Sequence, residues 1–480
     1  MIKRRWPALL LLLLVLDLAY SFWQHFHVAL GGDLSGIVVP DPWYEQVLID
    51  PLGLRALRGE VYAAPNRFFQ HQTIAQYFRA VPLWLQAWAA PIDSVYLACA
   101  VAKTAIQALL IYLLGVYISG RRAVLNRGWV LAAALVTPLF QTNGWNGQIG
   151  IIDKSVVYTF CYALPVALLL LFLLPYFRAA AAGQPVRLSV LGWVGVLGLV
   201  VFLSLNSPII TGVIALLGPG VLAYSWWQRW RTSTAPAGLG RAWVALRTMP
   251  VALLVPFGLF LLLSLYSLYL GRFNAENFTH TLPLAERYAR LPLGIYYQFK
   301  QKLGWPLMLL LLGVNRWLLG READTPTRRR LLLTLRWLGV FAAIYIVLLP
   351  LGGYREYRPY ILRRDTLLPV IIGVVYWYGA SSYYLLRLPN WAPRRWYLPV
   401  LGAFSLLFLL TDTPVRHDSN TCEREAMATL AAAPQDVVVL DNDCPVMAWT
   451  KFASPQDSET NAKLLLHWGV TKKKTLYYHR

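Results

Sequence analysis

Apolar runs of roughly 15–25 residues recur along nearly the whole chain, and short polar or basic segments separate them. Each run is about long enough to cross a hydrocarbon core of ~30 Å as an α-helix. The pattern predicts an all-α polytopic membrane protein with about eleven transmembrane helices. These spans are expected at about 7–24, 92–118, 128–141, 150–177, 188–205, 207–227, 249–271, 305–319, 337–352, 367–386 and 397–411. The first run lacks a small-x-small cleavage site, so it is interpreted as an uncleaved helix rather than a signal peptide.

Composition and charge support this class. The chain is 57% hydrophobic and only 14% charged, which is unlike a soluble globular enzyme. Its net charge of +21 comes largely from basic residues in every second loop, the pattern that orients membrane proteins, so nucleic acid is not an expected partner. With the N-terminus inside, the cytoplasmic loops carry Lys3, Arg4, Arg5, Arg121, Arg122, Arg127, Arg178, Arg187, Arg229, Arg231, Arg241, Arg247, Arg321, Arg328, Arg329, Arg330, Arg336, Arg387, Arg394 and Arg395. An odd number of spans then places the C-terminus outside.

The predicted organisation is a transmembrane body, 1–411, followed by a small outer α/β tail, 412–480. The body has long outer loops at 24–91, 272–304 and 353–366. In the first loop, apolar and polar residues alternate at helical spacing, which predicts amphipathic helices lying on the membrane surface with a bend near Pro82. The apolar face is Ile74, Tyr77, Phe78, Val81, Leu85 and Trp88, and the polar face is Gln72, Gln76, Arg79 and Gln86.

The tail is too short for an independent enzyme domain. It contains Cys422 and Cys444, and an extracytoplasmic location would allow a disulfide between them. The other two cysteines, Cys99 and Cys161, lie in apolar runs and are interpreted as small packing residues.

Acidic residues gather just beyond the first span, in "GGDLSGIVVPDPWYEQVLIDPLG". Carboxylates beside a membrane surface can act as a general base or hold a divalent cation that bridges a substrate phosphate. The alternative is that they cap helices and form turns, and the Asp-Pro pairs at Asp41 and Asp50 favour it there. Asp33 follows two glycines close to the membrane, so it is the preferred functional carboxylate, and Asp41 and Glu45 are second choices.

An arginine-rich segment, "GGYREYRPYILRRDT", occupies the predicted outer loop at Gly352–Thr366. Guanidinium groups bind phosphate in a bidentate way, and a lipid phosphate would lie at this depth. The alternative is snorkelling toward anionic headgroups, which predicts scattered rather than crowded basic residues. The density favours a phosphate pocket formed by Arg355, Arg358, Arg363 and Arg364.

Other charged residues lie in or near the spans. Asp17, inside the first apolar run, should face protein or water, because a carboxylate in hydrocarbon is costly. Asp153 and Lys154 either pair with each other, or Lys154 joins the phosphate pocket. His25, His27 and His71 are interpreted as polar surface residues, so no metal site is expected.

The layout resembles the polytopic glycosyltransferases of the C superfamily, which use polyprenyl-phosphate-linked sugars. The resemblance rests on the acidic first outer loop "GGDLSGIVVPDPWYE", the amphipathic helices of that loop and the outer tail. It implies that Asp33 is the catalytic acid and that Arg355, Arg358, Arg363 and Arg364 hold the donor phosphate. Some members have two adjacent acids and this chain does not, which leaves the choice open among Asp33, Asp41 and Glu45.

The same resemblance implies a bacterial inner-membrane enzyme with a periplasmic site, a polyprenyl-phosphate sugar donor and an acceptor that the sequence does not identify. Participation of a divalent cation, Mg²⁺ or Mn²⁺, is left open. The competing hypothesis is a transporter or flippase for a lipid-linked or anionic substrate. An odd span count and the lack of a visible internal repeat count against it.

Overall fold

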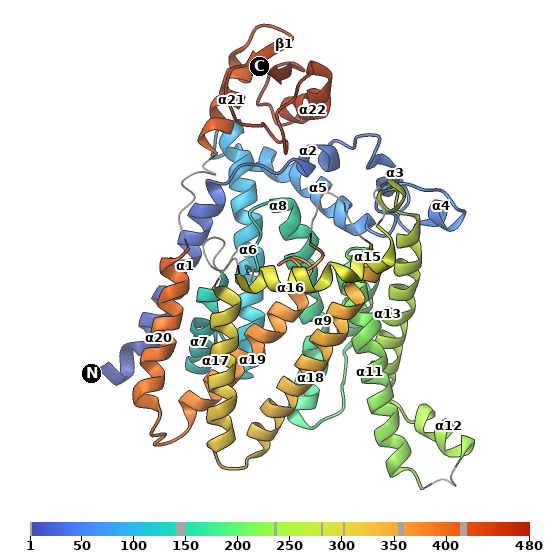
Figure 1. The fold of residues 1–480 in the computed structure, drawn as a ribbon, viewed down its shortest axis with the longest axis vertical. Helices are drawn as coiled ribbons and strands as arrows, with labels where there is room; N and C mark the ends of the chain where they lie inside the picture. Colours follow the sequence, from blue (N-terminus) through green and yellow to red (C-terminus); the bar gives the residue numbers. More distant parts are fainter. Residues whose placement is uncertain are drawn as a thin grey trace.

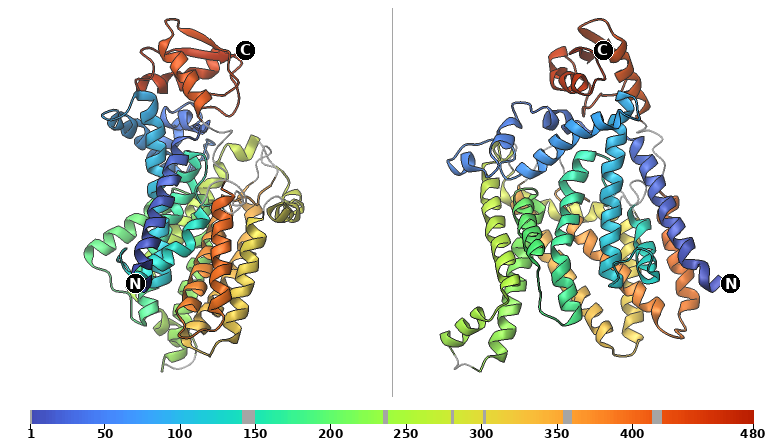
Figure 2. Two further views of the ribbon diagram at one scale, coloured as in Figure 1. Left: turned by 90° about the vertical axis from the view of Figure 1, so that its left-hand side faces the viewer. Right: turned by 180° about the vertical axis from the view of Figure 1, so that it is seen from behind.

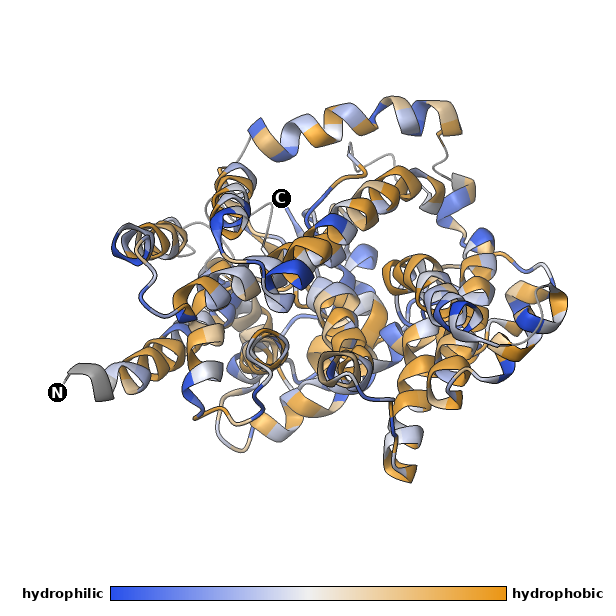
Figure 3. Ribbon diagram, turned by 90° about the horizontal axis from the view of Figure 1, so that it is seen from below, coloured by the Kyte–Doolittle hydropathy of each residue, from blue (hydrophilic) through white to orange (hydrophobic). Residues whose placement is uncertain are grey.

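The computed structural model describes residues 2–140, 150–234, 238–279, 282–300, 303–353, 360–412 and 420–480. Long helices run side by side, and the C-terminal tail packs against one end of the bundle (Figure 1). We call this the tail-side end. The apolar residues are spread over the bundle, whereas hydrophilic residues concentrate in the connecting segments (Figure 3).

Each predicted span overlaps at least one helix, although the fourth begins with non-helical residues 150–155 and the last residue of the third lies outside the described residues. The long helices are α1 (Ile2–Phe26), α6 (Pro91–Ser119), α7 (Arg127–Val136), α9 (Leu164–Ala182), α10 (Val190–Ser204), α11 (Pro208–Thr232), α13 (Val251–Leu270), α17 (Gly304–Arg321), α18 (Pro326–Leu348), α19 (Leu368–Arg387) and α20 (Arg394–Leu410). In the described part of the chain, six helical stretches are long and apolar enough to cross a membrane, or up to seven if a bent pair counts as one. These helices make it an all-α membrane protein, whereas eleven spans and their orientation stay predictions.

Local sequence explains how these helices begin and end. Pro91 occupies the first turn of α6, where its missing N–H leaves no hydrogen bond unmade. The same helix ends at Gly120, whose φ of 70° is the left-handed conformation that glycine adopts readily. Inside the bundle, α17, α19 and α20 are joined by a buried polar network. In it, Asn315 Nδ2 donates to Ser381 Oγ (2.8 Å) and Ser382 Oγ (3.0 Å), and Tyr397 Oη donates to Asn315 Oδ1 (2.7 Å).

The first predicted outer loop forms α2 (Asp33–Val38), α3 (Glu45–Ile49), α4 (Leu54–Leu57) and α5 (Phe68–Leu85) at the tail-side end (Figure 1). The prediction that the apolar face of α5 rests on lipid is wrong for its centre. Ile74 and Phe78 are fully buried by protein, because α5 packs against α6 and the tail. Only the C-terminal end of this segment exposes large apolar side chains, Trp84 at 69% and Trp88 at 81%.

The second long loop contains α14 (Glu276–Thr279), α15 (Leu284–Ala289) and α16 (Leu291–Lys300). The α15–α16 segment is bent by 82° from α17, so it runs across the bundle rather than along it (Figure 1). Leu293, Tyr296 and Phe299 are 43–50% exposed on α16. The sequence predicts an outer loop at 272–304, and exposed aromatic and apolar side chains of this kind suit the interface between membrane and water.

The tail contains α21 (Thr421–Ala432), β1 (Val437–Leu440), a 3₁₀ turn η6 (Pro455–Ser458), α22 (Glu459–His467) and β2 (Leu476–His479). Its two strands pair in parallel, with Val437 opposite Leu476 and Leu440 opposite His479. Cys422 and Cys444 are joined by a disulfide, and Cys99 and Cys161 are free and buried. The tail shares one hydrophobic cluster with α2, α5 and α6 and lies directly above them in two views (Figure 2), so it is continuous with the body.

Candidate functional site

Asp33 is the first residue of α2 and lies where the body meets the tail. Trp449 Nε1 of the tail donates a hydrogen bond to Asp33 Oδ1 at 3.1 Å. The two preceding glycines make this approach possible. A Cβ on Gly32 would lie 2.7 Å from the backbone nitrogen of Trp449, and a Cβ on Gly31 would lie 2.7 Å from Ser155 Oγ. The "GGD" sequence therefore holds the carboxylate against both the tail and the segment that leads into α9.

The other loop acids have different surroundings. Asp41 Oδ1 accepts hydrogen bonds from the backbone N–H groups of Trp43 and Tyr44, both at 3.0 Å, which is a turn-forming role. Burial raises the pKa of Asp41, although these two hydrogen bonds oppose the shift. Glu45 is exposed on α3. Of the three acids, only Asp33 has a hydrogen bond to the tail among those described here.

Asp50 has the structural role that its Asp-Pro sequence predicts. Its carboxylate accepts hydrogen bonds from the backbone N–H groups of Leu54 and Arg55, each at 2.8 Å, and from Tyr62 Oη at 2.6 Å. Burial by itself would raise the pKa of Asp50, but these hydrogen bonds outweigh it and lower the pKa. Asp50 is therefore an anchor of the loop.

The arginine loop approaches the start of α9 through Arg364. Both Nε (3.0 Å) and Nη2 (2.5 Å) of Arg364 donate to Asp153 Oδ2, although 211 residues separate the two. Asp153 thus forms a long-range ion pair, in which its side chain is only 12% exposed, and its predicted pairing with Lys154 stays a prediction. Arg363 pairs with Asp365 of its own loop. Arg355 and Arg358 lie outside the described residues.

A small recess opens beside this ion pair. It is lined by Gly150, Ile151, Asp153, Tyr158, Tyr162, Arg364, Asp365 and Leu368. Its volume of about 10 Å³ holds roughly one water molecule. A larger ligand therefore requires the lining side chains to move.

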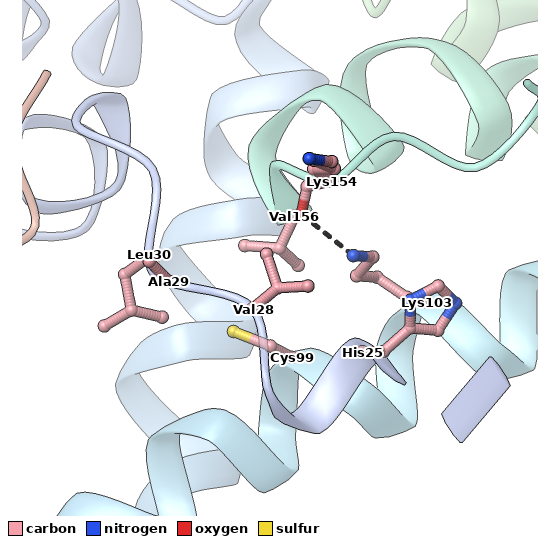
Figure 4. Close-up of a pocket in the computed structure, with 8 residues that line it drawn as sticks. All are labelled: His25, Val28, Ala29, Leu30, Cys99, Lys103, Lys154 and Val156. Atoms are coloured by element: carbon pink, nitrogen blue, oxygen red, sulfur yellow. Dashed lines mark hydrogen bonds between the residues drawn. The ribbon is translucent and has the colours of Figure 1, made fainter. Parts of the chain in front are cut away.

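Lys103 is a candidate residue that the sequence reading missed. It lies within α6 and is 1% exposed, and its Nζ donates to the backbone oxygen of Lys154 at 2.8 Å (Figure 4). It also interacts electrostatically with Asp153, Arg364 and Lys154, so its charge is coupled to the Asp153–Arg364 ion pair. The sequence does contain a signal for Lys103, because it is the lone lysine of a 29-residue apolar helix. Burying an ionisable side chain there costs free energy, so such residues are usually functional.

The surface interpretation of two histidines is wrong. His25 is 1% exposed, its Nε2 lies 3.3 Å from Gln107 Oε1, and its ring faces the same small cavity as Lys103 (Figure 4). His71 is 4% exposed on α5, and burial lowers its pKa to about 4. His25 and His71 are buried because α1 and α5, which carry them, both pack against α6. Within the described residues, no group of three or more His, Cys, Asp or Glu side chains is arranged to hold a metal ion.

Asp33 and Arg364 flank the same short segment, 153–158. Asp33 accepts from Trp449, whose ring centroid lies 6.2 Å from that of Tyr158. Tyr158 and Arg364 line the same recess, and Asp153 Oδ1 accepts from the backbone N–H of Ser155 at 2.9 Å. A π-helical turn, Thr159–Ala163, follows directly, and such turns often occur at functional sites. Asp33 is thus linked through Trp449 and Tyr158 to the recess that Asp153 and Arg364 line, at the tail-side end of the bundle.

The chain was compared with protein-family models, curated proteins and solved structures, and none of them matches.

Proposed function

We propose that this protein is a membrane glycosyltransferase that moves a sugar from a polyprenyl-phosphate-linked donor to an acceptor hydroxyl. The observation that carries the proposal is the chain of contacts from Asp33 through Trp449 and Tyr158 to the recess that Asp153 and Arg364 line. Asp33 can remove a proton, and Arg364 with the neighbouring lysines can bind an anion. Both lie where several apolar helices end, which is where a lipid-linked phosphate would sit.

The mechanism is a single displacement at the anomeric carbon. Asp33 removes the proton from the acceptor hydroxyl, and the acceptor oxygen forms a bond to the anomeric carbon. The bond from that carbon to the phosphate oxygen breaks, and the phosphate leaves with the electron pair. Arg364, Lys103 and Lys154 stabilise the negative charge that develops on the leaving group, a contribution that is often larger than general-base assistance.

The proposed site faces the periplasm from a bacterial inner membrane. Two features support this orientation: the disulfide in the tail, which persists in oxidising compartments, and the concentration of basic loops at the opposite ends of the helices. Arg364, Lys103 and Lys154 would supply positive charge for the phosphate.

The test is the Asp33→Asn variant, with Glu45→Gln as the matched control on the same loop. Cells that carry each variant are compared for the sugar modification that the wild-type gene restores to a deletion strain. General-base assistance is worth roughly 10²–10⁴-fold, so Asp33→Asn should lose nearly all product and Glu45→Gln should retain it. Wild-type product levels in a normally expressed Asp33→Asn strain would remove this residue from the mechanism.

The runner-up is a transporter or flippase for an anionic or lipid-linked substrate. One observation favours it: Lys103, His25, Gln107 and Ser21 form a buried polar group between α1 and α6, inside the bundle. Purified protein in vesicles separates the two hypotheses. Movement of a fluorescent polyprenyl phosphate across the bilayer without any sugar transfer would favour the transporter.

A further inference from the structure

Trp449 is unusual among the aromatic residues around the candidate site. Its side chain is 58% exposed, although its indole N–H is held by Asp33 at 3.1 Å. Its backbone and ring pack on Gly32, where an added Cβ would lie 2.6 Å from the indole Cδ1. The ring is thus fixed at its polar edge and along one side, while more than half of its surface stays open.

Trp449 begins a row of aromatic rings. The Tyr158 ring lies 6.2 Å from it, tilted by 33°, and the Tyr162 ring lies 5.9 Å from Tyr158, tilted by 76°. Tyr158 and Tyr162 both line the recess that contains Arg364. The row therefore runs from the proposed base, Asp33, to the proposed phosphate-binding arginine.

The chemistry of such a row selects a particular class of ligand. The face of an aromatic ring carries partial negative charge, and the C–H bonds on one face of a pyranose carry partial positive charge. A sugar ring can therefore stack on Trp449 while its hydroxyls hydrogen-bond to polar atoms beside it. An exposed tryptophan next to a carboxylate offers both kinds of contact, whereas an acyl chain would use only the apolar face of the ring.

We infer that Trp449 and Tyr158 form a stacking platform for a pyranose ring, so that the tail supplies part of the sugar-binding site. The inference rests on the proposed function, because it takes the ligand to be the donor sugar or a sugar of the acceptor. It goes further by giving the tail a direct binding role. It also limits the ligand class to saccharides with an apolar C–H face.

The test measures sugar binding without sugar transfer. Saturation-transfer-difference NMR on the full-length protein in nanodiscs uses a panel of methyl pyranosides, and farnesyl phosphate linked to the same sugars, as probes. Wild-type protein should give signals concentrated on the protons of one sugar face. Loss of one aromatic contact should weaken binding about three- to tenfold in Trp449→Ala. Trp449→Phe keeps a ring and should retain most of the binding.

The matched control is Trp88→Ala, because Trp88 is 81% exposed at the same end of the molecule but lies outside the aromatic row. Peptide mapping of the Cys422–Cys444 disulfide verifies that the tail of each variant is folded. Equal binding by wild type and Trp449→Ala, or equal loss in Trp88→Ala, would overturn the inference. Signals from methyl pyranosides assign the platform to a free sugar, and signals from the phosphate-linked probes alone assign it to the donor.

The two proposals fail in different ways. If Asp33→Asn cells make normal product while Trp449-dependent pyranoside binding persists, the protein binds saccharides but the transfer mechanism is wrong. If no probe binds at Trp449 while product depends on Asp33, the platform is wrong and the transferase proposal stands.

Discussion

Glu423 of α21 joins the tail to the membrane body through hydrogen bonds. Replacing Glu423 is therefore the most direct test of how the candidate site is assembled. The side chain is 1% exposed. Its Oε2 accepts hydrogen bonds from the Leu30 backbone N–H (2.9 Å) and Tyr96 Oη (2.8 Å), and its Oε1 accepts from the Met447 backbone N–H (2.8 Å). Leu30 leads into "GGD", and Met447 lies two residues before Trp449. One carboxyl group thus positions both sides of the proposed sugar site.

The magnitude follows from these three contacts. A hydrogen bond contributes about 0.5–1.5 kcal/mol net, and each buried donor that Glu423→Ala leaves without an acceptor costs about 1–3 kcal/mol. The variant also removes the free-energy cost of burying the carboxyl group, and this offsets part of the lost hydrogen-bond stabilisation. We therefore expect a net loss of about 3 kcal/mol in tail docking, which is on the order of a 100-fold rise in the undocked fraction.

Hydrogen–deuterium exchange of α21 in nanodiscs measures this fraction directly. Amide protection over Thr421–Ala432 should fall on the order of 100-fold in Glu423→Ala. Glu425→Ala is the control, because Glu425 lies on the same helix but is exposed. Equal protection in the two variants would refute the assignment of Glu423 as the residue that docks the tail.

Burial raises the pKa of Glu423 above its usual 4.5, despite the opposing hydrogen bonds from Met447, Leu30 and Tyr96. A raised pKa means that the folded protein binds the proton more tightly than the unfolded chain does. The stability that this group contributes is therefore complete below about pH 4.5 and declines as the pH rises through the shifted value. The exchange difference between wild type and Glu423→Ala should accordingly be larger at pH 4.5 than at pH 7.5, and a larger difference at pH 7.5 would contradict this sign.

Two further variants test the cationic cluster and the bundle. Arg364→Gln should lower transfer by roughly 10²-fold or more and destabilise the fold, because it removes the guanidinium that donates two hydrogen bonds to the mostly buried Asp153 carboxylate. Adding Asp153→Asn should restore stability in thermal melts but not transfer, and recovery of transfer would reduce Arg364 to a structural role. Asn315→Leu should lower the unfolding free energy by about 1–2 kcal/mol, because it removes the hydrogen bonds that join α17, α19 and α20. An unchanged denaturation midpoint would exclude that network from bundle stability.

Much of the architecture could be predicted from hydrophobic pattern alone. Apolar runs mark each long helix because a buried or lipid-facing helix must satisfy its own backbone hydrogen bonds and present apolar side chains. The same reasoning placed a strand and a helix in the tail, at β1 and α22. Helical caps were less predictable. Ser458 precedes α22 and is a residue type that often caps helices, but its hydroxyl donates to the Pro455 backbone oxygen and accepts from the Tyr477 backbone N–H.

The site was only partly predictable. Asp33 and Arg364 could be proposed because each is a charged residue in an unexpected place, and this signal is local. Their partners, Trp449 and Asp153, lie 416 and 211 residues away, and no local pattern encodes those pairings. Lys103 was overlooked because a single lysine barely alters the average hydropathy of a long helix.

The sequence by itself determined which segments are helical, since helix formation and bilayer length depend on neighbouring residues and on the apolar content of one segment. It also determined that acidic and arginine-rich loops flank those helices. Tertiary structure alone decided that the tail packs onto α2 and α5, that His25 and Lys103 face inward, and that Asp153 rather than a neighbouring residue pairs with Arg364. These outcomes depend on how distant helices pack, and packing minimises the burial of unpaired charge over the whole molecule rather than within any one segment.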